Sequence, residues 1–147
     1  MSNTIRGIGA GLVATMVLSM IMVAKGMMGL MPELNVIMML SKMMNSAPII
    51  GWIAHFMIGM LVWGLGFSAV ARFLPGSSNV TKGISFGIAA WAMMMVAVMP
   101  MAGAGFFGLK MGMVAPVMTL MLHVIYGAVL GLVYGKLGSK TTAAEEA

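Results

Sequence analysis

Two histidines, His55 and His123, are the residues whose type and setting could do chemistry in this chain. Each lies inside an apolar stretch long enough to cross a membrane, where an ionisable side chain is costly and is therefore a candidate for function. Each follows a proline (Pro48 or Pro116) by seven residues, which is about 10 Å along a helix that rises roughly 1.5 Å per residue. Two imidazoles at one depth predict axial ligation of a haem, part of a copper or zinc site, or a proton relay.

The alternative interpretation of both histidines is structural. Each neutral imidazole would hydrogen-bond a carbonyl or hydroxyl group on a neighbouring helix and so fix the packing.

For a haem, the glycines near both histidines would leave room for the porphyrin, and Lys42 and Lys110 could meet its propionates. The sequence leaves both interpretations open.

Methionine thioethers are the second candidate, because soft sulfur ligands suit Cu(I). The chain has 22 methionines. Those expected near the outer side of the membrane could form a metal site, alone or with the histidines: Met99, Met101, Met111 and Met113. Methionines also run through all four apolar stretches, where they are more simply flexible apolar fillers.

Enzyme chemistry finds little support in this sequence. There is no cysteine, so thiolate chemistry and disulfides are excluded. Glu33 is the only acid before the C-terminal tail, so neither a carboxylate pair nor a Ser-His-Asp set can form. No phosphate-binding loop is present either. We expect a protein that is not an enzyme.

The segment around the first histidine is repeated in the second half of the chain. One set of residues recurs 68 positions later: Met31, Pro32, Lys42, Met43, Ala47, Pro48, His55 and Gly59 return as Met99, Pro100, Lys110, Met111, Ala115, Pro116, His123 and Gly127. A second set, Arg6, Gly7 and Gly11, returns 76 positions later as Lys82, Gly83 and Gly87. This predicts internal repeats over about residues 5–72 and 81–140.

Composition indicates the elements that carry these residues. A chain with 61% hydrophobic and 7% charged residues is a membrane protein, because soluble domains carry about 25% charged residues. Four apolar stretches are long enough to span a bilayer as helices, at about residues 7–24, 49–71, 83–106 and 113–135. We predict one all-α transmembrane domain over residues 1–147, a four-helix bundle of two duplicated, parallel helical hairpins with short interfacial helices in the two outer loops.

Glycines predict how these helices pack. Gly51 and Gly59 share a helix face with His55 in the first half. Gly127, Gly131 and Gly135 follow His123 at spacings of four in the second half. Small residues at such spacings let helices approach closely in lipid, so we expect association within the chain, between chains, or both.

Basic residues indicate the orientation. Of the eight, Arg6, Arg72, Lys82, Lys136 and Lys140 lie on the side of the two termini, and Lys25, Lys42 and Lys110 lie on the other. The excess on the first side predicts cytoplasmic termini. No basic run with interleaved aromatic residues occurs, so we expect no nucleic-acid partner.

Several short strings resemble a family of bacterial inner-membrane proteins with four helices and about this length, defined only as a domain of unknown function. The strings are Met31-Pro32-Glu33-Leu34-Asn35-Val36-Ile37, Gly51-Trp52 with His55 and Gly59, Trp63-Gly64, and Ala115-Pro116 through His123 to Tyr126-Gly127. The resemblance covers Arg6 to Gly138. It implies a four-helix fold in the bacterial inner membrane and carries over no activity.

These observations predict a small integral membrane protein of the lipid bilayer. The leading expectation is a structural or accessory subunit without a cofactor, which associates with itself or with a larger membrane complex. A haem- or copper-binding protein that uses His55 and His123 is the first alternative. A small transporter or channel with a path beside the repeat axis is the second.

Overall fold

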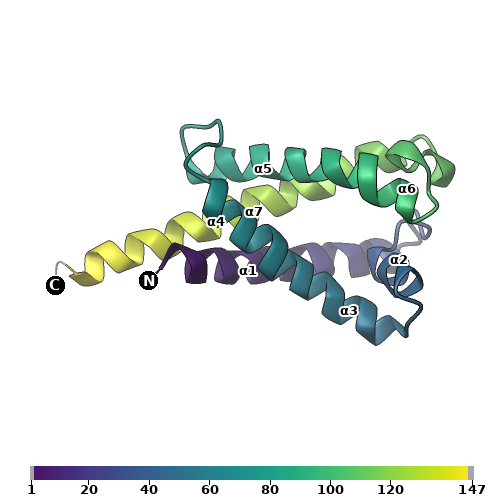
Figure 1. The fold of residues 1–147 in the computed structure, drawn as a ribbon, viewed down its shortest axis with the longest axis horizontal. Helices are drawn as coiled ribbons and strands as arrows, with labels where there is room; N and C mark the ends of the chain where they lie inside the picture. The colour runs from purple at the N-terminus through teal and green to yellow at the C-terminus, as the bar shows by residue number, and fades with distance from the viewer. Residues whose placement is uncertain (1, 146–147) are drawn as a thin grey trace.

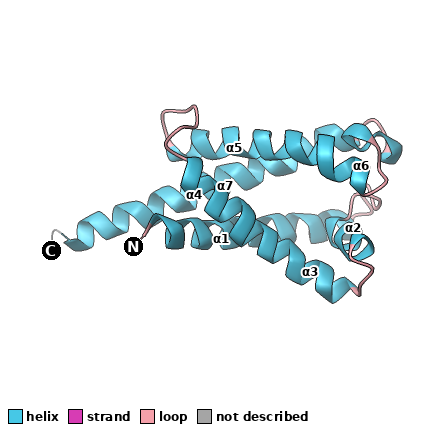
Figure 2. Ribbon diagram, viewed as in Figure 1, coloured by secondary structure: helices cyan, strands magenta, loops and turns pink. Residues whose placement is uncertain are grey.

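The structure, a computed structural model, describes the backbone of residues 2–145 and the side chains of residues 2–139. Its elements are helical, and no strand occurs among residues 2–145 (Figure 1, Figure 2). Four helices are long and apolar enough to cross a membrane: Asn3–Met27, Pro48–Val70, Asn79–Met101 and Ala115–Ser139. The predicted all-helical fold with four membrane-spanning helices is therefore confirmed, while the duplication of the hairpins stays a prediction.

Two of the four spans are single α-helices, α1 (Asn3–Met27) and α7 (Ala115–Glu145). The other two each contain a π-helical segment. The second span runs through α3 (Pro48–Met57), the π-helical η1 (Ile58–Gly64) and α4 (Leu65–Val70). The third runs through α5 (Asn79–Met93), the π-helical η2 (Met94–Val98) and α6 (Met99–Met101). A π-helical turn shifts the carbonyl groups out of the regular ladder and often marks a functional position.

Local sequence explains where the spans begin. The Ser2 side chain accepts a hydrogen bond from the backbone N–H of Ile5 and caps α1. Pro48 occupies the first turn of α3, where its missing N–H is not needed. Before α5, the Ser78 side chain accepts from the Thr81 N–H at 3.2 Å while the Thr81 hydroxyl accepts from the Ser78 N–H at 3.0 Å. Together these bonds make a capping box.

The two loops at the end away from the termini, which keep the name outer loops from their predicted side of the membrane, differ from each other (Figure 1). The first contains α2 (Val36–Met43), capped by Asn35 and packed against α3 at Gly51. The second contains a short 3₁₀ segment, η3 (Phe106–Met111). The third span was predicted to reach residue 106, but it ends at Met101. Gly103 (φ 78°) and Gly105 (φ 76°) follow it in left-handed conformations that an α-helix cannot continue through.

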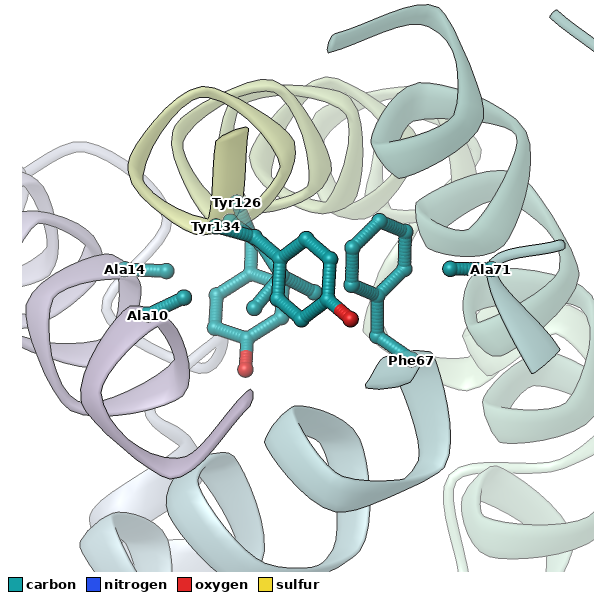
Figure 3. Close-up of a cluster of buried hydrophobic side chains, with 7 residues drawn as sticks. Ala10, Ala14, Phe67, Ala71, Tyr126 and Tyr134 are labelled. Atoms are coloured by element: carbon teal, nitrogen blue, oxygen red, sulfur yellow. The ribbon is translucent and has the colours of Figure 1, made fainter. Parts of the chain in front are cut away.

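The two hairpins join at the end of the molecule that holds both termini and the α4–α5 turn (Figure 1). Helix α1 packs against η1 and α4, α5 packs against α7, and α1 also packs against α7. A buried core cluster fills this end: Ala10, Ala14, Phe67, Ala71, Tyr126, Leu130 and Tyr134. In it the Phe67 and Tyr134 rings meet edge to face, with centroids 5.2 Å apart (Figure 3).

The glycines predicted to pack helices lie at close contacts. Gly59 of η1 lies against the Thr15 side chain of α1. Gly127 meets the backbone of Gly83, and Gly131 and Gly135 both lie against Asn79. Gly51 differs, because it lies under Ser41 of α2 and does not contact another span there. A side chain at any of these five positions would collide with its neighbour.

Candidate ligand-binding cavity

A cavity of about 760 Å³ opens between the two hairpins, on the side away from the core cluster. Residues of α1, α2, α3, η1, α5, η2, α6 and α7 and of both outer loops line it. His55 and His123 both lie in its wall. Ligand sites in proteins are concave, mostly apolar spaces of about 300–1,000 Å³ with a few placed polar groups. The cavity fits that description.

The floor of the cavity is closed by contacts between the halves. Tyr126 of α7 donates a hydrogen bond to the carbonyl oxygen of Gly59, 2.8 Å away in η1. Trp63 lines the cavity and meets Phe86 of α5 edge to face, with ring centroids 5.9 Å apart. Beneath them lies the core cluster, to which Tyr126 itself belongs. The cavity is therefore a pocket that ends at a packed core.

The hydrogen bonds of His55 define its tautomer. Ser19 donates its hydroxyl proton to the Thr15 carbonyl oxygen at 2.7 Å. The Ser19 oxygen must then accept from His55, whose Nε2 lies 3.2 Å away. His55 thus carries its proton on Nε2, and this bond ties α3 to α1. His55 is 8% exposed. Its bond to Ser19 is an interhelical hydrogen bond, as the structural interpretation of the histidines expects.

His123 has the opposite arrangement. Its Nδ1 lies 2.8 Å from the Thr119 carbonyl oxygen, which can only accept, so Nδ1 carries the proton. Among the described side chains, Arg6 Nε is the one buried nitrogen or oxygen without a hydrogen-bond partner. The Nε2 of His123 has no partner within residues 2–139, so it must be accessible, and His123 lines the cavity. His123 therefore has an unprotonated, accessible Nε2 and is one of the residues that line the cavity.

Charged residues gather around the mouth of the cavity. Lys42 of α2 and Lys110 of η3 both line it, one from each outer loop, as does Glu33. All three side chains are exposed. The mouth therefore carries two positive charges and one negative charge around an apolar interior.

Lys25 builds one rim of the mouth. Its ammonium group donates to the carbonyl oxygens of Leu30 (2.8 Å), Met31 (2.8 Å) and Leu34 (3.1 Å). The side chain is only 8% exposed, so these bonds satisfy a buried charge. They fold the chain after α1 back over its helix end, and the residues that follow, Pro32 to Val36, line the cavity.

The four methionines proposed as metal ligands lie in different surroundings in the structure. Met99 is buried, and its side chain and that of Met111 pack over Gly108 in the second outer loop. Met101 lines the cavity as these two do, although it is 75% exposed. Met113 is 80% exposed and lies outside the cavity wall. Among the described residues, no group of three or more His, Cys, Asp or Glu side chains gathers to hold a metal ion.

Three residues of the site were missed by sequence reasoning. Ser19 lies one turn after Thr15 in α1, and a small polar residue in a membrane helix indicates packing and not a bond to a particular histidine. Tyr126 carries a hydroxyl inside an apolar stretch, which is a signal, because such a group needs a hydrogen-bond partner. Lys25 gives no comparable signal, because a lysine at the end of a span usually extends to the headgroups.

These features define a class of protein: a small four-helix membrane protein with a histidine-walled cavity between two hairpins. A sequence model of the family described as "Family of unknown function (DUF6789)" matches residues 1–145, and the chain belongs to that family. The predicted membership of a family of unknown function is confirmed. No curated protein and no solved structure matches the chain.

Proposed function

We propose that this protein binds an apolar or amphipathic molecule within the membrane, in the cavity between its hairpins. One observation carries the proposal: both intramembrane histidines lie in the wall of a single cavity of about 760 Å³. A residue placed only for packing needs no open space beside it. An apolar space walled by two imidazoles provides burial for a ligand body and hydrogen-bonding or ligating groups for its polar part.

The closed floor favours binding over conduction. A transporter or channel needs a path that continues toward the other side, and the core cluster lies below Tyr126 and Trp63. Thr119 lines the cavity, but Ser85, which a path through the second half could use, bonds the carbonyl oxygens of Pro75 and Thr81 at the other end. A transport role would require the halves to rearrange.

The proposal also includes an orientation. The start of α1, the end of α7 and the α4–α5 turn lie at one end of the molecule, and α2 and α6, whose residues line the cavity, lie at the other (Figure 1). Basic residues are more numerous at the first end, so the positive-inside rule favours cytoplasmic termini. In a bacterial inner membrane, the cavity would then face the outer side.

The role of structural or accessory subunit stays compatible with this proposal. A ligand-binding protein of this size could hold its ligand for a larger membrane complex or for a second copy of itself. Many large apolar side chains are exposed on the spans, and lipid or a partner helix would cover them equally well.

Native mass spectrometry of protein purified in mild detergent tests the proposal. Met94 lines the cavity, whereas Val96, two residues later, is 51% exposed outside it. We expect a bound mass on the wild type and on Val96→Trp, and binding weaker by about tenfold or more on Met94→Trp, whose larger side chain takes up part of the cavity. A wild type with no bound mass beyond detergent and bulk lipid would contradict the proposal.

A further inference from the structure

We propose that the cavity takes an iron porphyrin and that Nε2 of His123 is its axial ligand. This inference rests on the proposed function, since it names the chemistry of the molecule in the cavity. It follows from three features of the wall: the protonation state of His123, the number of protein donors, and the charges at the mouth.

The hydrogen bond of His123 prepares this residue to ligate. A histidine that binds a metal almost always donates its other ring N–H to a carbonyl or carboxylate group, which fixes the tautomer and the ring orientation. The Nδ1–H of His123 donates to the Thr119 carbonyl oxygen at 2.8 Å. Thr119 is itself fixed, because its hydroxyl donates to the Ala115 carbonyl oxygen (2.8 Å) and accepts from the Trp91 indole N–H (3.1 Å). The lone pair of Nε2 is then free to form a coordinate bond.

The number of donors selects the kind of metal centre. A bare zinc ion needs about four protein donors, or three in a catalytic site, and no group of three His, Cys, Asp or Glu side chains occurs among the described residues. Met99 and Met111 pack over the loop backbone at Gly108. An iron that arrives with the four nitrogens of a porphyrin needs only one more ligand from the protein. Nε2 of His123, whose Nδ1–H is held by the Thr119 carbonyl oxygen, supplies that ligand.

The shape and charge of the cavity fit the rest of such a molecule. A porphyrin has a large apolar ring, which the space between the hairpins would bury, and two carboxylates at one edge. Lys42 and Lys110 line the mouth from its two sides. Ammonium groups form their stronger hydrogen bonds with carboxylates.

His55 differs from His123, and this difference makes the proposal specific. Its Nε2, the ring nitrogen farther from the backbone, donates its proton to Ser19 at 3.2 Å, so His55 cannot ligate through Nε2 as His123 does without breaking the link between α3 and α1. The two histidines are therefore not equivalent, although the sequence places them alike. We expect one axial histidine and an iron that is five-coordinate when reduced.

The test is titration of the purified, detergent-solubilised full chain with haemin, followed by its visible spectrum and by tryptophan quenching. The wild type and His55→Leu are expected to bind one equivalent, with a sharp Soret band. His123→Ala is expected to bind at least about 100-fold more weakly, since a ligand mutation exceeds the 10–100-fold typical of outer-shell residues. Loss of binding in His55→Leu equal to that in His123→Ala, or full binding in His123→Ala, would overturn the assignment.

Two further measurements separate the possible failures. Added imidazole should restore the Soret band of His123→Ala, because the small ligand occupies the space of the missing ring; a variant that had not folded would show no rescue. Iron-free protoporphyrin should bind the wild type and His123→Ala alike, because its binding needs the cavity and not the ligating nitrogen. Porphyrin binding without any dependence of haemin binding on His123 would overturn this inference and leave the proposed function standing. A bound mass in native spectrometry that neither porphyrin displaces would do the same.

Discussion

The hydroxyl group of Tyr126 donates a 2.8 Å hydrogen bond to the carbonyl oxygen of Gly59, across the line where the two hairpins meet. Gly59 lies in the π-helical segment η1, and Tyr126 follows His123 by one turn in α7. The bond thus closes the floor of the cavity just below the level of the histidines. It joins the first half to the second at the place where the core cluster ends.

Tyr126→Phe should destabilise the protein by about 0.5–1.5 kcal/mol, because it removes a buried hydrogen bond between the two hairpins. The matched control is Tyr134→Phe. Tyr134 is also buried in the core cluster, but no hydrogen bond of its hydroxyl occurs among the described residues. Thermal unfolding in one detergent, followed by tryptophan fluorescence, compares the two. Equal melting temperatures for both variants would contradict a role for the Tyr126 bond.

Lys25→Met should loosen the first outer loop. It removes three charged hydrogen bonds to the carbonyl oxygens of Leu30, Met31 and Leu34, and each bond of this kind contributes about 1.5–3 kcal/mol. We expect faster amide hydrogen exchange over residues 29–36 and little change in α5 and α7. Lys82→Met at the opposite end is the control. If the loop exchanges at the wild-type rate in Lys25→Met, the lysine does not hold the rim.

Gly127→Ala should cost about 1–3 kcal/mol, because a methyl group there meets the backbone of Gly83 and Ile84, which cannot give way as a flexible side chain could. Gly26→Ala is its control: the same substitution in α1 meets no atom within 4 Å. It should be neutral or stabilising by up to about 1 kcal/mol, through helix propensity alone. The melting temperature in detergent should fall for Gly127→Ala and stay level or rise for Gly26→Ala. An equal fall in both variants would contradict close packing at Gly127.

The absence of cysteine from the chain allows the cavity to be probed with single thiols. Met94→Cys places a thiol in the cavity wall, and Val96→Cys places one on the exposed outer surface of the same segment. A water-soluble maleimide needs the thiolate, which an apolar environment disfavours. In lipid bilayers we expect Met94→Cys to react about tenfold faster or more than Val96→Cys. A tenfold ratio of rates corresponds to a difference of about 1.4 kcal/mol in activation free energy. Equal rates would mean that the cavity is closed to water.

The sequence predicted the number and type of the spans because composition and length alone decide them. It also predicted a helix in the first outer loop, where Asn35 caps α2. It placed the two histidines at one depth from their spacing to Pro48 and Pro116, and both line one cavity. The proline and glycines after Met99 indicate the end of the third span. The prediction followed the apolar composition instead and placed the end of this helix beyond Met101, where the helix ends in the structure.

The cavity itself could not be predicted, because its volume depends on the distribution of the large side chains between the two ends of the bundle. Tyr126 and Phe67 fill the joined end, and no local pattern marks them as partners of Ala10 and Ala14. The π-helical segments were equally hidden, since they follow from packing and not from local propensity. The different hydrogen bonds of His55 and His123 depend on Ser19 and Thr119, so two histidines in equivalent sequence positions have different tautomers.

The central claim is that a non-protein molecule occupies the cavity and contacts its histidines. An experimental structure of the full chain, purified with its native lipids and without added ligand, tests this most directly. The account predicts continuous non-protein density between the hairpins, in contact with His123 and ending near Lys42 and Lys110. A bundle whose hairpins close on each other, with His123 packed against protein and no space between the halves, would contradict it.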